Sequence, residues 1–258
     1  RACNFYYGKN AGLLIENKSA LPLCGNKNIA FDKIEIITRN KNKITSNIIN
    51  IKKISKLNTS LNKIVRKDLK KIVLKRHNFL KNINFLQPEI MGILNLTPDS
   101  FSDGGKFNAK KKAKNHILSM IKAGAKIIDI GGESTRPGSK TIPDKIEWKR
   151  IETIVRNFKR DNKKTCLSVD TRKSLVMINS IKYGVDLIND VSGFNYDINS
   201  LIKLKKFKVS KVLHHMKGTP NTMQKNPYYR NVLLDIYDYF EKGIKKIGDK
   251  KIIIDPGI

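Results

Sequence analysis

The sequence predicts an α/β fold built on a parallel β-sheet, and two observations support this prediction. From Pro88 onward, six short apolar segments alternate with five longer amphipathic segments. Strict alternation of this kind is typical of strands joined by helical crossovers. The short segments are also apolar almost throughout, as expected of parallel strands that are covered on both faces.

The expected strands and helices follow one another without interruption to the last residue. The strands are predicted at 89–96, 126–132, 165–171, 186–193, 211–218 and 251–258, and the helices at 109–124, 145–161, 172–184, 195–207 and 231–248. Gly124 and Gly184 follow two of the amphipathic segments directly and are good helix stops. This pattern fits either an open doubly wound sheet or a TIM barrel.

The ends of the predicted strands distinguish the two folds. Nearly every strand ends in a polar or glycine-rich group: Asn95, Gly131-Gly132, Asp170, Asn189-Asp190, His215 and Asp255. An open sheet usually binds its ligand only at the strands of a switch point, whereas all the strands of a barrel end at one mouth. The sequence therefore predicts a TIM (β/α)8 barrel that is incomplete, with six strands present and two missing.

Residues 1–86 differ from the rest of the chain. Strand-like or mixed apolar runs come first, and residues 42–80 form a basic segment without glycine or proline. Apolar residues recur every three or four positions from Ile54 onward, which predicts that part of this segment is helical. We expect 1–86 to be a separate N-terminal extension of unknown role with a basic connector, and 87–258 to form the barrel domain.

Composition restricts the classes of function. The chain has 52 Lys and Arg against 22 Asp and Glu, a net charge of +30. This charge could indicate a nucleic-acid-binding protein. In such a protein the basic residues should cluster on one surface, whereas the lysines of this chain are scattered through every segment. There is no apolar run long enough to cross a membrane and no signal-peptide pattern. Cys3, Cys24 and Cys166 lack metal or disulfide spacing. We expect a cytoplasmic protein that binds neither nucleic acid nor membrane.

Two loops that follow the first two strands carry unusual polar residues. The first, TPDSFSDGG, places the aromatic Phe101 in a long polar segment, which is typical of a mobile lid, although an ordinary turn would also fit. In the second, GGESTRPGS, Ser134, Thr135 and Arg136 offer hydroxyls and a guanidinium suited to an anion. A helix cap is the alternative reading of that loop.

The later strand ends suggest a site for a heterocycle. Asp170, Asn189 and Asp255 together could bind a ring that carries amino and N–H donors, as pterins and guanines do. Each also has a structural alternative: Arg172 could pair with Asp170, Asn189 and Asp190 could cap a helix, and Asp255-Pro256 could form a turn. His215 and Met216 are expected at the fifth strand end, where Met216 could pack on an aromatic ligand or fill the core. Adjacent histidines face opposite ways on a strand, which argues against a zinc site.

Six motifs in order resemble those of the dihydropteroate synthase family: MGILNLTPDSFSDGG, IDIGGESTRPGS, SVDT, INDVSG, HMKGTPNTMQ and DPGI. The resemblance implies a TIM barrel, a homodimer and Mg²⁺ as cofactor. The implied reaction condenses 6-hydroxymethyl-7,8-dihydropterin diphosphate with 4-aminobenzoate, releasing pyrophosphate. It assigns Asn95 to the metal and the diphosphate. It further assigns Thr135, Asp170, Asn189 and Asp255 to the pterin diphosphate, and Phe101 and Pro137 to 4-aminobenzoate.

The sequence departs from that family in two ways. Residues 1–86 lie outside its core pattern, and the sequence ends at Ile258, before the lysine and the Arg-x-His motif that the family places on its last two strands. We therefore expect a truncated chain that is inactive and poorly stable by itself. A pterin-dependent methyltransferase and a non-catalytic pterin-binding paralogue are the alternatives, although a methyltransferase has no use for a diphosphate site.

Overall fold

A computed structural model describes the chain except for residues 42, 98–104, 135–138, 219–221, 223–226, 249–250 and 258, and except for the side chains of 105–109. The chain divides into two compact units. Unit 1 comprises Arg1–His77 with Phe85–Gln87, and unit 2 comprises Asn78–Asn84 with Pro88–Ile258. No helix in the described ranges is both long and apolar enough to cross a membrane.

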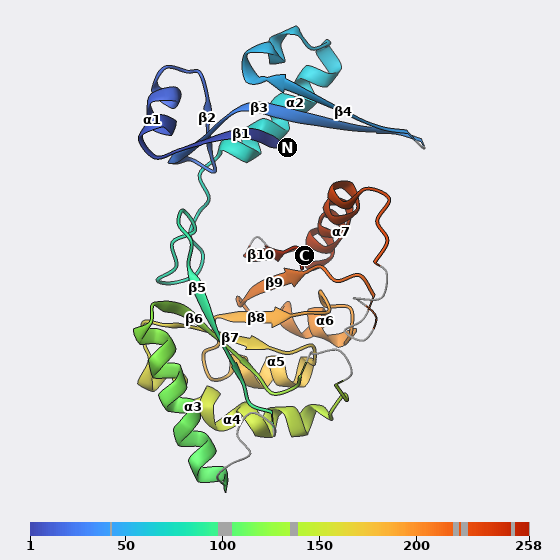
Figure 1. Cartoon of the computed structure of the whole chain (residues 1–258). Helices are drawn as coiled ribbons and strands as arrows, with labels where there is room; N and C mark the ends of the chain where they lie inside the picture. Colours follow the sequence, from blue (N-terminus) through green and yellow to red (C-terminus); the bar gives the residue numbers. More distant parts are fainter. Residues whose placement is uncertain are drawn as a thin grey trace. The chain divides into compact units, whose positions relative to one another are not determined.

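Unit 1 is an antiparallel sheet with two helices. Its elements are β1 (Ala2–Tyr7), α1 (Gly8–Glu16), β2 (Leu21–Leu23), β3 (Asn26–Asn40), β4 (Lys43–Asn50), a 3-10 helix η1 (Ile51–Lys56) and α2 (Thr59–Val73). β3 lies between β1 and β2, and its second half pairs with β4 in a two-stranded ribbon (Figure 1). Phe31 and Ile34 of β3 pack with Ile54 and Val65 to form the core of this sheet and α2.

Helical structure after Ile54 was predicted and is present in η1 and α2. The prediction missed α1, because its sequence GKNAGLLIE is short and carries two glycines, which weaken the helical signal. Ala11 of α1 is buried against Ala20 and Ala30, so packing on the sheet stabilises a helix that propensity alone does not.

Unit 2 has the predicted α/β architecture. Its strands are β5 (Ile90–Asn95), β6 (Ala125–Gly131), β7 (Cys166–Asp170), β8 (Leu187–Asp190), β9 (Ser210–His214) and β10 (Ile252–Asp255). Its helices are α3 (Gly105–Lys122), α4 (Asp144–Asp161), α5 (Ser174–Ile181), α6 (Asn199–Leu204) and α7 (Val232–Ile247). All neighbouring strands are parallel, in the order β10-β9-β8-β7-β6-β5. The predicted strands and helices are thus confirmed, with ends that differ by a few residues.

The strand order and the position of the helices favour barrel geometry over a doubly wound sheet. Each strand lies beside its neighbour in sequence, so the order never reverses as it does at a switch point. One buried cluster contains residues from all the helices α3 to α7 together with Leu94, Val169 and Leu213 of the strands, so these helices cover the same face of the sheet (Figure 1). Among the described strands, β5 and β10 are the two ends of an open path.

Because neighbouring residues on a strand face opposite ways, this helix-covered face identifies the side chains of the other face. Leu94, Val169, Ile188 and Leu213 pack against the helices. The residues that follow them, Asn95, Asp170, Asn189 and His214, therefore point to the inner face, at the carboxyl ends of their strands. This edge of the sheet is the mouth at which ligands bind in barrels of this type.

Candidate active site

A row of polar side chains crosses the mouth in strand register. Asn95 of β5 pairs with Gly131 of β6, Gly131 pairs with Asp170 of β7, and Asp170 pairs with Asn189 of β8. A Cβ atom on Gly131 would lie 3.0 Å from Oδ1 of Asn95 and 3.6 Å from Oδ2 of Asp170. The glycine therefore leaves open the space between the amide of Asn95 and the carboxyl group of Asp170.

Asp170 is a carboxyl group in an unfavourable environment. Burial raises its pKa well above the ordinary value, and the negative charges of Asp129, Asp190, Glu147 and Glu133 raise it further. An isolated buried carboxylate is costly unless donors reach it. Strongly perturbed carboxyl groups in a strand-end cluster are typical of functional sites. The geometry therefore suits a ligand that offers N–H donors or positive charge to Asp170.

Asp129 lies one layer below this row, on the same face of β6 as Gly131. Its side chain is only 3% exposed. Nδ2 of Asn189 donates a hydrogen bond of 2.9 Å to Oδ2 of Asp129, reaching across β7. Burial raises the pKa of Asp129, and the hydrogen bond from Asn189 partly offsets this effect. Asp129 was not singled out in the sequence, because it lies within the apolar run KIIDIGG.

Asp190 has a structural role, in contrast to its neighbour Asn189. It is fully buried, and its Oδ1 accepts hydrogen bonds from the backbone N–H (2.8 Å) and hydroxyl (2.6 Å) of Ser192. Its Oδ2 accepts a third from the N–H of Phe194 at 3.2 Å. These bonds shape the loop after β8, where Gly193 has a φ of +60° and faces the hydroxyl of Tyr239. Asp190 therefore stabilises the turn after β8 and caps no helix, because the N-cap position of α6 is Ile198 and receives no side-chain hydrogen bond. The helix-capping alternative for Asn189 and Asp190 was wrong.

The pKa of Asp190 predicts a pH dependence of stability. Burial raises it from 3.8 to about 6. The folded state then holds the proton more tightly than the unfolded state, so a stabilising contribution is present below the unfolded pKa and is lost as the pH rises through the folded pKa. The rise of this pKa from 3.8 to about 6 corresponds to about 3 kcal/mol in total.

Urea unfolding of the wild type and of Asp190→Asn, which cannot ionise, measures this contribution. We expect the stability of the wild type relative to the variant to fall by about 2 kcal/mol as the pH rises from about 4 to about 6, and by about 3 kcal/mol in all once the pH is well above 6. A difference between the two proteins that stays constant over this range would contradict the assignment.

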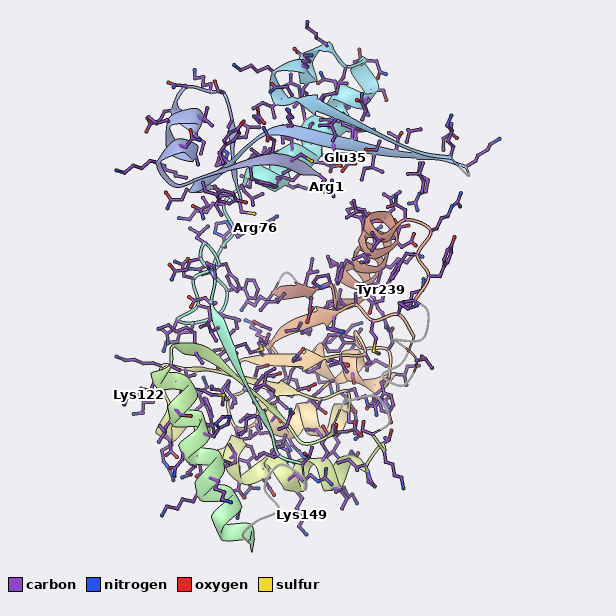
Figure 2. All side chains as sticks on the ribbon, viewed as in Figure 1. Arg1, Glu35, Arg76, Lys122, Lys149 and Tyr239 are labelled. Carbon is purple, nitrogen blue, oxygen red and sulfur yellow. The ribbon has the colours of Figure 1, made fainter. Side chains whose placement is uncertain are left out.

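The fifth strand end holds a different histidine from the one expected. Nδ1 of His214 lies 3.0 Å from Oδ2 of Asp255, its register partner on β10. His215 is buried on the helix side, with its ring 4.9 Å from that of Tyr239. The hydroxyl of Tyr239, labelled in Figure 2, donates a hydrogen bond of 2.8 Å to the carbonyl oxygen of His214. His214 therefore faces the inner side, and the placement of His215 at the mouth was wrong.

A buried ion cluster supports the loop after β6. We call it the Glu133 cluster; it consists of Glu133, Glu147, Arg172 and Lys173. Nζ of Lys173 donates to Oε1 of Glu133 at 2.9 Å and to Oε2 of Glu147 at 2.6 Å. Nε of Arg172 donates to Oε2 of Glu133 at 2.9 Å. Arg172, considered as a partner of Asp170, thus pairs with Glu133 instead.

The pKa values of the two glutamates follow from these contacts. Burial alone would raise the pKa of Glu133, but hydrogen bonds from Arg172, Lys173 and the N–H of Ile142 hold it below the ordinary value. For Glu147, burial outweighs the hydrogen bond from Lys173 and raises the pKa. The cluster joins Glu133, near the start of the GGESTRPGS loop, to α4 and to the segment after β7.

Several predicted residues lie outside the described part of the chain. These are Phe101 of the first loop and Thr135, Arg136 and Pro137 of the second. Met216 is described; it follows β9 and its side chain is half-buried. The roles expected for these residues stay predictions.

Cysteine thiols and metal ligands are two further kinds of functional group. The three cysteines are free, and burial raises the pKa of Cys166 to about 12, so its thiol is a poor nucleophile. Within the described residues, His, Cys, Asp and Glu side chains form no group of three or more with metal-binding geometry. The side chain of Asn95 is exposed at the mouth.

Comparisons with known proteins match the second unit. The family model described as "Pterin binding enzyme" matches residues 91–258. The dihydropteroate synthase of Haemophilus influenzae is 41% identical over 175 residues, covering 64% of this chain and 62% of that protein. That of Escherichia coli K12 is 38% identical over 185 residues, covering 68% and 64%. The chain thus spans less than two thirds of the length of these relatives.

Solved structures agree. A Yersinia pestis dihydropteroate synthase in complex with a sulfonamide drug is 37% identical, with a TM-score of 0.64, and the match covers 70% of this chain and 68% of that one. The Anaplasma phagocytophilum dihydropteroate synthase with bound 6-hydroxymethylpterin-monophosphate is 33% identical, with a TM-score of 0.59, over 66% and 67%. The family model covers most of the length of the chain, and the solved structures share the fold of unit 2. The chain therefore belongs to the pterin binding enzyme family.

Proposed function

We propose that the protein is a dihydropteroate synthase, which condenses 6-hydroxymethyl-7,8-dihydropterin diphosphate with 4-aminobenzoate and releases pyrophosphate. The observation that carries this proposal is the polar row at the mouth, above all the strongly perturbed carboxyl group of Asp170 beside the amide of Asn189. The relatives named above carry the same activity in their names, and the proposal extends it to this chain.

The pterin ring would lie across this row. Asp170 and Asp255 would accept hydrogen bonds from its N–H groups, and Asn189 would offer its free amide oxygen. His214 holds Asp255 from the neighbouring strand. A ring with several N–H donors would satisfy the buried Oδ1 of Asn189 and the carboxyl groups beside it.

The reaction needs such acceptors. The aromatic amine of 4-aminobenzoate is a weak nucleophile, and it attacks the CH₂ group of the pterin as the C–O bond to diphosphate breaks. Positive charge then develops on the dihydropterin, and carboxylates bonded to its N–H groups stabilise that charge. The amine loses a proton and pyrophosphate leaves with the bonding electron pair. Loops that close over the site would exclude water as a competing nucleophile.

Asn95, Thr135 and Arg136 would bind the diphosphate, and we propose Mg²⁺ as the cofactor. Magnesium usually keeps several waters and binds through one or two protein oxygens together with substrate phosphates. A single exposed amide oxygen of Asn95 at the mouth fits that requirement. The ion would offset the negative charge that builds on the leaving group.

The remaining assignments come from the family, except that of Met216, which rests on a polarisable side chain at the fifth strand end. Phe101 and Pro137 would enclose 4-aminobenzoate, and Met216 would contact the pterin. We propose that 87–258 forms the pterin-binding domain, that 1–86 forms a separate extension, and that the protein is a cytoplasmic homodimer.

Formation of dihydropteroate tests the proposal. Protein expressed from the complete reading frame is incubated with the dihydropterin diphosphate, labelled 4-aminobenzoate and Mg²⁺, and the product is separated by chromatography. We expect magnesium-dependent labelled dihydropteroate and release of pyrophosphate. A folded protein that binds pterin without forming product would instead be a binding paralogue or another pterin enzyme.

A methyl group at Gly131 should weaken pterin binding. In Gly131→Ala the new Cβ would occupy the space between Asn95 and Asp170, so we expect an affinity for 6-hydroxymethylpterin that is about tenfold lower. Calorimetric titration measures the change. Gly12→Ala is the control, because nothing lies within 4 Å of its Cβ position; an equal loss in both variants would contradict the assignment.

A further inference from the structure

The orientation of the Asn189 side chain carries information about its ligand. An asparagine amide presents donors at its nitrogen and an acceptor at its oxygen, so its rotation by half a turn reverses what the site offers. Hydrogen-bond partners decide which orientation is present. In Asn189, one partner is well defined: Nδ2 donates to Oδ2 of Asp129 at 2.9 Å.

Asp129 is suited to fix this orientation. An ionised carboxylate accepts hydrogen bonds and cannot donate them. With Asp129 in this form, the amide nitrogen of Asn189 must face it, and the amide oxygen must face away. Asp129 is 3% exposed, so water cannot readily replace it as the partner of Asn189. The helix-facing Asp190 on the same strand makes its contacts with the following loop and does not compete.

The other end of the amide is left without a partner. Oδ1 of Asn189 is buried and accepts no hydrogen bond from any residue that the structure describes. A buried acceptor without a donor is costly, and a bound ligand could supply that donor. Asp170, the register partner of Asn189 on β7, adds a second acceptor beside it.

We propose that Asp129 is a positioning residue that sets the donor and acceptor pattern of the pterin site by fixing the Asn189 amide with its oxygen toward the ligand. This inference rests on the proposed function. The site then selects a ring edge that carries an amino group, such as the 2-amino edge of a pterin. A ring with a carbonyl group at that position, such as a lumazine, would face two acceptors.

Selectivity between two ligands tests this role, because a purely structural role would weaken both equally. Binding of 6-hydroxymethylpterin and of its 2-oxo analogue 6-hydroxymethyllumazine is measured by calorimetry at mildly alkaline pH, which favours the carboxylate form of Asp129. We expect the wild type to prefer the pterin about 100-fold. In Asp129→Asn, whose side chain can accept or donate, the Asn189 amide can rotate, so this ratio should fall about tenfold.

Two further variants make the test specific. The double variant Asp129→Asn/Asn189→Asp restores the internal hydrogen bond with its direction reversed and still presents an oxygen to the ligand. We expect the double variant to recover the preference for the pterin. If the single variant fails to fold, the double variant still tests the inference. Asp161→Asn is the control, since it makes the same change at an exposed carboxyl group remote from the mouth and should leave the ratio unchanged.

The possible outcomes separate the inference from the proposed function. If both the wild type and Asp129→Asn bind the pterin with the same ratio of pterin to lumazine affinity, the inference is overturned and the proposed function is not. A folded wild type that binds no pterin would overturn the proposed function and the inference with it. A fallen ratio that the double variant does not restore would also contradict the positioning role.

Discussion

Replacing Asp170 with asparagine should lower the affinity for 6-hydroxymethylpterin about 100-fold and reduce dihydropteroate formation at least as much. The variant keeps the shape of the side chain and loses the charge. An amide offers one acceptor where the carboxylate offers two, and it places an NH₂ group against the N–H groups of the ligand. It also cannot stabilise positive charge on the dihydropterin as a carboxylate does.

The same change should make the folded protein more stable. The pKa of Asp170 is raised well above its ordinary value by burial and by neighbouring carboxylates, so its ionised form destabilises the fold at neutral pH. An asparagine removes that cost. Lower affinity together with a higher melting temperature is the combination expected of a group retained for function.

Calorimetric titration and thermal unfolding of the two proteins measure both effects. Asp161→Asn is the control, because this exposed aspartate at the end of α4 is remote from the mouth. Unchanged pterin affinity in Asp170→Asn would remove Asp170 from the site. Loss of affinity that accompanies unfolding of the variant would show that its role is structural.

Replacing Lys173 with methionine should lower the free energy of unfolding by about 3–5 kcal/mol. Lys173 is 6% exposed and makes ion pairs with Glu133 and Glu147. Methionine fills a similar volume and removes the cation, so two buried carboxylates lose a partner. Glu133 keeps Arg172, whereas Glu147 would keep no cation among the described residues.

Denaturant unfolding of matched variants distinguishes charge from packing. Lys149→Met on the exposed face of α4 (Figure 2) should change stability by less than about 0.5 kcal/mol. Adding Glu147→Gln to Lys173→Met should restore part of the loss, because it removes one unpaired charge. A Lys173→Met variant as stable as wild type would contradict the cluster, and a double variant with purely additive losses would contradict the charge argument.

Sequence patterns predicted the architecture of unit 2 well for a physical reason. Parallel strands buried on both faces must be apolar along their whole length, so each one is visible as a short run between helices. The polar residues that end these runs then mark the mouth, which is how Asn95, Asp170, Asn189 and Asp255 could be found. Helix ends were less accurate: α6 begins at Asn199 and not at Asn195, because Asp190 shapes the preceding loop.

The residues that sequence patterns missed depend on contacts between distant positions. Glu133, Glu147 and Lys173 come from three segments, and no local spacing shows that they meet. The alternation of side chains along a strand could have identified Asp129. It lies two residues before Gly131 and therefore faces the same inner side of the sheet. The same reasoning would have favoured His214 over His215, because His214 shares the inner face with Val212 and Ser210, whereas His215 follows it outside the strand.

A crystal structure of the protein with 6-hydroxymethylpterin would test the central claim most directly. We expect the pterin ring to lie at the mouth, with its 2-amino edge within hydrogen-bond distance of Oδ1 of Asn189 and of the acidic side chains beside it, and with Asp129 still bonded to Nδ2 of Asn189. A pterin bound away from Asp170 and Asn189, or one that turns its carbonyl edge toward Oδ1 of Asn189, would contradict the account.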